Sequence, residues 1–238
     1  MIKANIRIGD WILMPEFKTD KALVLSARKL GENTYTLSLF TRSHGRHLGV
    51  YKKKLPPMVG SFVEGRWQAR LPEQMGHFYV EPTNNLTAEF LDDKKRLACI
   101  ASVCALLDST LPERQNYSDF FDNTMTFLNT LTNDSFLTDY VRWESDLLAT
   151  LGYGLDCSGC AGGGDDNDLA YISPKTGRAV SKQMGAPYHD KLLTLPKFLW
   201  RNSEASTQEI KQGLALTKYF FENYAPIKSL PKVRELLY

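Results

Sequence analysis

The sequence lacks the long apolar runs that would place it in a membrane. No stretch of about 18 apolar residues occurs in the 238-residue chain, so the sequence predicts no membrane span and no membrane partner. Residues 1–14 include Lys3, Arg7 and Asp10, and they lack the unbroken apolar core and the cleavage site of a signal peptide. We therefore expect a cytoplasmic protein.

Motifs for catalysis are also missing. The sequence contains no G-x-S-x-G, no Walker phosphate loop and no H-E-x-x-H. A Gly-rich stretch does carry Asp165, Asp166 and Asp168, which leaves a metal-dependent nuclease as a rival hypothesis. These carboxylates do not form an ordered set on strands, and in such a loop they favour a solvated surface. The sequence therefore predicts a binding protein and no enzyme.

Cysteine is scarce, with four in the chain. Cys99 and Cys104 fall in an apolar stretch with helical periodicity and are expected as thiols in the core. Cys157 and Cys160 form a C-x-x-C, which is only half of a structural zinc site because a closed site needs four ligands. With no second C-x-x-C, we interpret the pair as vestigial and expect no metal site and no cofactor.

Charge is abundant but unevenly spread. Residues 1–80 hold 13 Lys or Arg and 6 Asp or Glu (+7), residues 81–150 hold 5 and 12 (−7), and residues 151–238 hold 11 and 9 (+2). Such a split favours different partners for different parts of the chain. The basic third suits a polyanion. The sign of its charge alone does not distinguish nucleic acid from an acidic protein tail. A solvated basic face is the alternative.

Residues 22–82 alternate between short β-patterned runs and turn residues. Gly31-Glu32-Asn33 and Ser43-His44-Gly45 are typical of hairpin turns, and Pro56-Pro57 bars regular pairing. Five short strands in about 60 residues predict a small barrel. The expected strands are Ala22–Lys29, Thr34–Thr41, Arg46–Lys52, Ser61–Leu71 and His77–Glu81.

After Pro82 the apolar period becomes helical, with an irregular insert at residues 155–189 that has room for one or two hairpins. The expected helices are Thr87–Leu111, Tyr117–Leu131, Ser135–Leu151, a helix from the capping box at Ser206 and Glu209 to about Tyr224, and Lys232–Tyr238. The sequence thus predicts an α+β multi-domain protein. Its parts are an N-terminal extension (residues 1–19), an all-β barrel domain (20–83) and an α-helical domain (84–238).

The barrel strands combine positive charge with aromatic side chains. Alternation along Ser61–Leu71 places Phe62, Arg66, Gln68 and Arg70 on one face and Val63, Trp67, Ala69 and Leu71 on the other. Small barrels bind single strands by stacking bases on aromatics while Lys and Arg track the phosphates. Tyr51 and Phe62 are candidates for stacking, with a place in the core as the alternative. The predicted DNA-binding residues are Arg42, His44, Arg46, His47, Tyr51, Lys52, Lys53, Lys54, Phe62, Arg66 and Arg70.

Several segments, taken in order, resemble the RecO family of bacterial recombination mediators. Gly31-Glu32 followed by LSLFTRSHG (Leu37–Gly45) is similar to the first hairpin of that family. VRWESDLLATLGYGLD (Val141–Asp156) leads into the C-x-x-C as in its zinc knuckle. The stretches Tyr171–Tyr188 and Ser229–Leu237 also match, so the resemblance covers roughly residues 20–238.

The resemblance implies an OB-fold barrel followed by a helical domain with a zinc-knuckle-like insert. It implies a protein that binds single- and double-stranded DNA, anneals complementary strands and, with RecR and the single-strand-binding protein SSB, assists RecA loading in repair by the RecF pathway. Such a protein is nucleoid-associated. Arg142 matches a family arginine that helps to hold the acidic SSB C-terminal tail; the alternative is an ion pair with Asp139 or Asp146. The alternative function is a generic OB-fold single-stranded nucleic-acid-binding module without annealing activity.

The sequence departs from the family pattern in its insert. Where the family has a second C-x-x-C, this chain has Ser181 and Met184, which leaves two thiolates and makes zinc doubtful. The insert is then expected to hold itself by ordinary packing. Residues 1–19 match no part of the family pattern.

Overall fold

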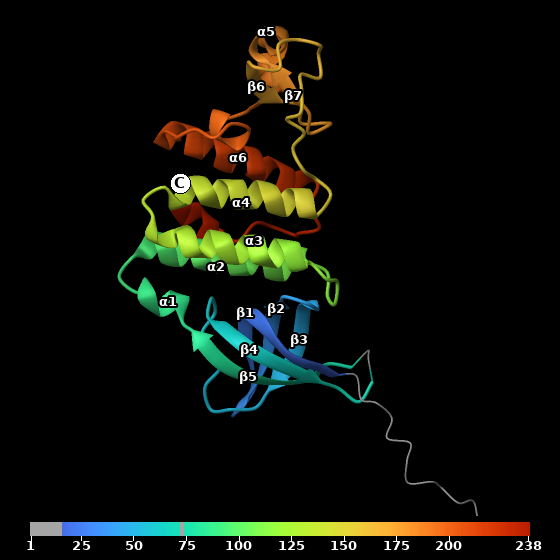
Figure 1. The fold of residues 1–238 in the computed structure, drawn as a ribbon, viewed down its shortest axis with the longest axis vertical. Coiled ribbons are helices and arrows are strands. Elements are labelled where there is room, and N and C mark those ends of the chain that lie inside the picture. The colour runs from blue at the N-terminus through green and yellow to red at the C-terminus, as the bar shows by residue number, and fades with distance from the viewer. Residues whose placement is uncertain (1–15, 72–73) are drawn as a thin grey trace, which may run out of the picture. The chain divides into compact units, whose positions relative to one another are not determined.

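A computed structural model of the chain describes residues 16–71 and 74–238 and divides into two compact units. The first unit comprises residues up to 89 together with 113–116, and the second comprises residues 90–112 and 117–238. Figure 1 shows that the first is built from strands and the second mainly from helices. The predicted order of a β-barrel followed by a helical region is confirmed.

The strands of the first unit form a closed barrel in the order β1-β2-β3-β5-β4, with β4 pairing back to β1. All neighbours are antiparallel except β3 and β5, which run parallel. This five-stranded closed arrangement is that of an OB-fold. The strands are β1 (Glu16–Gly31), β2 (Thr34–Thr41), β3 (Gly45–Tyr51), β4 (Phe62–Gln68) and β5 (Gly76–Asn84).

Strand β1 is long enough to serve two neighbours. Its first half, from Glu16 to Leu23, pairs with β4, and its second half, from Ala22 to Gly31, pairs with β2. The barrel therefore begins before residue 20, and residues 16–19, which we expected in an N-terminal extension, belong to β1. Residues 1–15 of that expected extension lie outside the described residues.

Two glycines close the barrel where β3 meets β5. Gly49 and Gly76 are register partners in the parallel pair. A Cβ at Gly49 would lie 2.5 Å from the Phe78 ring, and one at Gly76 would lie 2.4 Å from the Gln68 carbonyl oxygen. These separations are shorter than van der Waals contact, so the close approach of the strands requires glycine at both positions.

Along strands β3 and β4, every second side chain points into the barrel, and the side chains between them lie on its surface. Strand β3 buries Gly45, His47, Gly49 and Tyr51, while β4 buries Val63, Gly65 and Trp67. The alternation predicted for the fourth strand holds for the apolar face as far as Ala69. Leu71 is an exception, since β4 ends at Gln68 and Leu71 is 53% exposed.

The first predicted helix, Thr87–Leu111, is wrong in one respect because it is two helices. A short helix α1 (Leu86–Glu89) is followed by α2 (Lys94–Thr110), and Asp93 caps the second. The Asp93 carboxylate accepts hydrogen bonds from the backbone N–H groups of Lys95 and Arg96. These bonds satisfy amides at the start of α2 and fix its first residue.

Helix α4 (Phe136–Thr150) lies between α3 (Ser118–Asn129) and α6 (Thr207–Asn223) in the helical unit (Figure 1). Its inner face stacks Trp143 against Phe120, Phe127 and Tyr140. The predicted core thiols Cys99 and Cys104 on α2 are both buried. Short 3₁₀ segments complete the unit at Thr130–Thr132, Ala186–Lys191, Lys197–Leu199 and Lys232–Leu237 (η1 to η4).

A buried ion pair joins three elements of this unit. The Arg234 guanidinium on η4 donates from Nε to Glu144 Oε1 at 2.6 Å and from Nη2 to Glu144 Oε2 at 2.8 Å. Tyr140 and Thr217 donate further hydrogen bonds to the same carboxylate. Arg234 is 2% exposed and Glu144 0% exposed. The pair ties α4, α6 and η4 together.

The insert between α4 and α6 is more regular than the sequence predicts. Strands β6 (Leu169–Ile172), β7 (Ala179–Ser181) and β8 (Leu193–Thr194) form a sheet in the order β7-β6-β8, and a short helix α5 (Lys182–Gly185) follows β7. Within the described part of the chain, no helix combines the length and the apolar character needed to cross a membrane.

Candidate nucleic-acid interface

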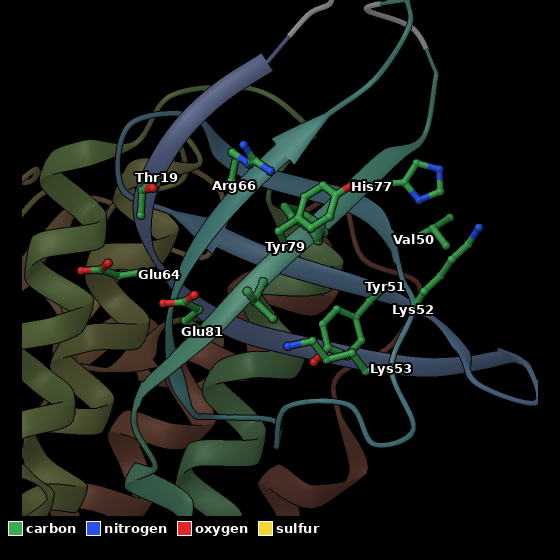
Figure 2. A pocket seen from close by; sticks show the side chains of 12 residues that line it. Thr19, Val50, Tyr51, Lys52, Lys53, Glu64, Arg66, His77, Tyr79 and Glu81 are labelled. Carbon is green, nitrogen blue, oxygen red and sulfur yellow. The ribbon is translucent and has the colours of Figure 1, made fainter.

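The candidate site is a groove of about 520 Å³ on the outer surface of the barrel. Strands β4 and β5 form its floor, and the residues after β3 form one side (Figure 2). Because β4 and β5 are antiparallel with register Arg66 to Tyr79, alternate side chains of both strands point out of the barrel into the same space. Polar and aromatic side chains therefore meet above an apolar interior.

Arg66 and Tyr79 form the centre of this groove. The Arg66 guanidinium carbon lies 4.8 Å from the centre of the Tyr79 ring, a distance at which a cation is attracted to the aromatic face. Tyr79 is 54% exposed although it is a large aromatic side chain. An exposed ring next to a fixed positive charge is the combination that holds a base and its phosphate.

Lysines from the end of β3 line the same groove. Lys52 and Lys53 are exposed, and Lys53 Nζ lies 5.9 Å from the centre of the Tyr51 ring. Figure 2 shows Lys52 with His77 at one end of the groove, and Lys53 beside Tyr51. The two lysines therefore share a groove with the exposed Tyr79 ring.

The opposite end of the groove is acidic. Glu64 and Glu81 are direct cross-strand partners on β4 and β5, and both line the groove. Figure 2 shows them at the end away from Lys52 and His77. Two carboxylates in register repel an anion, so the groove has a basic end that attracts phosphate and an acidic end that does not.

Two of the predicted DNA-binding residues are buried. Tyr51 lines the groove but is only 6% exposed and belongs to the barrel core, so the prediction that it presents its ring for stacking is wrong. His47 is also 6% exposed and packs edge-on against Trp67, with ring centres 5.4 Å apart. Burial, with Arg114 and His44 nearby, lowers the pKa of His47 to about 4, so this side chain carries no charge near neutral pH.

Other predicted residues lie outside the groove. The Arg46 guanidinium is 14% exposed and lies 3.5 Å from the Glu113 carboxylate. At the turn between β2 and β3, His44 Nδ1 lies 3.1 Å from Asp20 Oδ2, and Arg42 is exposed nearby in sequence. Among the predicted set, Lys54, Phe62 and Arg70 also fall outside the residues that line the groove. The structure thus gathers Tyr51, Lys52, Lys53 and Arg66 from that set around the groove.

The sequence interpretation missed Tyr79 as a site residue. The signal was present in the alternation of His77, Tyr79 and Glu81 with Phe78 and Val80 along the fifth strand. Alternation assigns the first set to the outside of a barrel, where an aromatic residue is exposed and needs another explanation.

Arg142 lies in the helical unit, on α4, and its side chain is 34% exposed. Its Nη1 donates to Asp139 at 3.1 Å, the ion pair considered as the alternative from sequence. Nε and Nη2 donate to the carbonyl oxygens of Phe198 and Ser203 at 3.2 and 3.3 Å. These bonds use three of the five N–H donors of the guanidinium and hold α4 to η3 and to the segment that follows it.

The C-x-x-C of the insert does not fit a zinc ion. Ser181 donates its backbone N–H to Cys160 Sγ at 3.2 Å. Burial raises the pKa of the Cys157 thiol to about 11, whereas hydrogen bonds outweigh partial desolvation and lower that of Cys160 to about 7. Across residues 16–71 and 74–238, no three His, Cys, Asp or Glu side chains gather as metal ligands would.

The chain has a closed OB-type barrel with a basic, aromatic groove, followed by a helical unit with a β-insert. This architecture places it in the class of OB-fold proteins that carry an additional helical unit. A family model described as the C-terminal part of recombination protein O matches residues 91–232. The chain is 44% identical over 214 residues to DNA repair protein RecO of Rhodospirillum centenum, covering 87% of this chain and 86% of that protein. RecO of Rhodospirillum rubrum (41%, 87% of each chain) and of Cereibacter sphaeroides (40%, 92% of this chain and 95% of that protein) are similarly related. The chain belongs to the RecO family.

Proposed function

We propose that this protein binds DNA in the groove between β4, β5 and the end of β3, and that it acts as a recombination mediator in DNA repair. The observation that carries the proposal is the exposed Tyr79 ring with Arg66 over its face and with Lys52 and Lys53 lining the same groove. The names of the RecO relatives support the connection with DNA repair. DNA binding in turn predicts association with the nucleoid.

Binding in this groove is electrostatic and independent of base sequence. Lysine and arginine neutralise phosphates and release counterions, so affinity falls as salt rises. Stacking on Tyr79 accepts any base because every base has an aromatic face. A strand held in this way has its charge partly neutralised, which allows a complementary strand to approach and pair. We propose that strand annealing follows from this arrangement.

Two variants test the groove. In Lys52→Ala/Lys53→Ala we expect weaker binding of single-stranded DNA and a salt dependence reduced by about 1.4 in log K per log salt, since each single-strand phosphate contact contributes about 0.7. In Tyr79→Ala we expect a loss of about 1–3 kcal/mol with the salt slope unchanged, because a stacking contact releases no counterion. Fluorescence anisotropy titrations at several salt concentrations measure both.

Exposed lysines of the helical unit provide the matched control. Lys211→Ala/Lys228→Ala removes the same charge from another surface and is expected to leave the affinity and the salt slope unchanged. A wild-type salt slope in Lys52→Ala/Lys53→Ala would remove the β3 end from the proposed interface.

Annealing separates the mediator from a generic OB-fold module. We expect the wild-type protein to speed pairing of complementary oligonucleotides coated with SSB, and the groove variants to lose that activity in proportion to their DNA affinity. Binding without acceleration would favour the module. In the proposed mediator role the protein also works with RecR and SSB to assist RecA loading.

We propose a second partner site at Arg142 for the acidic C-terminal tail of SSB. The unused N–H donors of this guanidinium suit a carboxylate, which arginine can bind through two parallel hydrogen bonds. We expect Arg142→Lys to weaken binding of an SSB tail peptide at least about tenfold, because lysine cannot reproduce the paired geometry. DNA affinity and thermal unfolding serve as controls, and wild-type peptide affinity in this variant would exclude Arg142 from the site.

A further inference from the structure

The loop between β3 and β4 exposes an apolar side chain next to its lysines. Leu55 is 75% exposed, and it directly follows the exposed residues Lys52, Lys53 and Lys54. Met58, three residues further on, is 45% exposed. Transfer of this exposed apolar side chain from water into an apolar site on a partner would be favourable.

The loop is fixed on both sides of Leu55. Before it, the Tyr35 hydroxyl donates to the Lys54 carbonyl oxygen at 3.2 Å. After it, Gly60 N–H donates to the Val24 carbonyl oxygen at 2.9 Å, and the Thr87 hydroxyl donates to the Val59 carbonyl oxygen at 2.8 Å. Leu55 is therefore presented by an anchored segment.

Two prolines add to this stiffness. Pro56 restricts Leu55 to extended conformations, and Pro56 and Pro57 each fix their own φ. A side chain held in one position before binding loses little conformational entropy when it is inserted into a partner. The loop is built to present Leu55 rather than to fold it back onto the barrel.

The loop continues from the proposed DNA groove. Lys52 and Lys53 line that groove together with Arg66 and Tyr79, and Leu55 lies two residues beyond Lys53. The lysines match a partner with an anionic surface, and Leu55 matches a partner with apolar space between stacked planar groups. Stacked DNA bases have that chemistry, and proteins that bend or open a duplex insert leucine, methionine or proline between base steps.

We propose that Leu55 is a wedge that enters a base step of duplex DNA and unstacks it, while Lys52–Lys54 hold the flanking phosphates. This inference rests on the proposed DNA-binding function and adds an action on the duplex to it. Anionic lipid is the competing partner for a basic loop with an apolar tip. The continuity of the loop with the Arg66–Tyr79 groove favours DNA.

The test uses the full chain and a short duplex in which 2-aminopurine replaces one adenine, because the fluorescence of this base rises when it is unstacked. With saturating wild-type protein we expect a rise of roughly twofold or more, since insertion separates the step. Leu55→Ser is expected to abolish the rise while keeping most of the duplex affinity. Its thermal unfolding should match the wild type because the side chain is exposed.

Leu30→Ser is the matched control. Leu30 is 64% exposed at the end of β1 and follows the basic residues Arg28 and Lys29, so it is another apolar side chain on a basic hairpin. We expect this variant to retain the fluorescence rise. If both variants lose it equally, a general loss of apolar surface explains the signal and the wedge is wrong.

The remaining outcomes separate the wedge from the DNA-binding proposal. Wild-type protein that binds the duplex without a fluorescence rise overturns the wedge and leaves DNA binding in place, as does a full rise in Leu55→Ser. Failure of the wild type to bind DNA overturns both proposals. Leu55-dependent binding to phosphatidylserine vesicles, with no rise on the duplex, overturns the wedge in favour of a membrane role.

Discussion

His47 shows how burial changes the role of a basic residue. The sequence places it in a cluster with Arg42, His44 and Arg46, but the β3 alternation turns its ring into the barrel against Trp67. Burial lowers its pKa from 6.5 to about 4, with Arg114 and His44 adding repulsion. The folded barrel therefore contains the neutral ring, while the unfolded chain takes up a proton below about pH 6.5.

This difference predicts an acid-sensitive barrel. The stabilisation that comes from the neutral His47 is complete above about pH 6.5 and is lost as pH falls towards about 4, because the unfolded chain then binds the extra proton. We expect His47 to account for about 2 kcal/mol of lost stability between about pH 7 and about pH 5. Hydrogen exchange of barrel amides at both pH values, in the wild type and in His47→Gln, measures it. An equal loss in the variant would show that other groups are responsible.

The elements of the helical unit depend on the ion pair between Glu144 and Arg234. Glu144 lies among the buried residues of α4, where a charged side chain is costly unless it is paired. Arg234 supplies the opposite charge, and its guanidinium also donates to the Leu214 carbonyl oxygen at 2.7 Å. The carboxylate keeps the pKa of Arg234 above its ordinary value although burial alone lowers it. Three elements thus share one charged contact.

Removing the arginine should therefore destabilise the whole helical unit. We expect Arg234→Ala to cost about 3–5 kcal/mol, because it leaves the Glu144 carboxylate buried without its counter-charge. Urea unfolding followed by hydrogen exchange should show the loss in the helices, with the barrel amides unchanged. The double variant Glu144→Gln/Arg234→Met should lose less than Arg234→Ala, since no unpaired charge remains. Equal losses in the two variants would contradict a charge-based role.

At the scale of the whole molecule, the sequence predicted the order of strands and helices well, but it predicted the contacts between them poorly. Turn residues and period-2 alternation were sufficient for five strands, and the change to a helical period located the helices, because both signals are local. The parallel pairing of β3 with β5 through Gly49 and Gly76 could not be predicted, since it depends on distant strands. The break before α2 was missed because the capping role of Asp93 was not recognised within a longer periodic stretch.

The candidate site was predicted only in part, because local patterns in the sequence do not show which distant side chains lie together. The basic charge of residues 1–80 was evident, and Lys52, Lys53 and Arg66 do line one groove. Charge alone could not distinguish exposed lysines from Arg46, whose partner Glu113 lies far along the sequence. Nor could it place Glu64 and Glu81 side by side at the acidic end. Tertiary pairing decides which charges act together.

The distance along the sequence between Glu144 and Arg234 has a consequence for biosynthesis. The two partners are separated by 90 residues, so a ribosome that has just made α4 must add the whole insert and α6 before the counter-ion exists. At about 5–20 residues per second this takes roughly 5 to 20 s. The barrel, whose strands are complete by residue 84, can fold during that interval, whereas the helices wait with an unpaired carboxylate. Nascent chains should therefore acquire protease resistance in two stages, the barrel first.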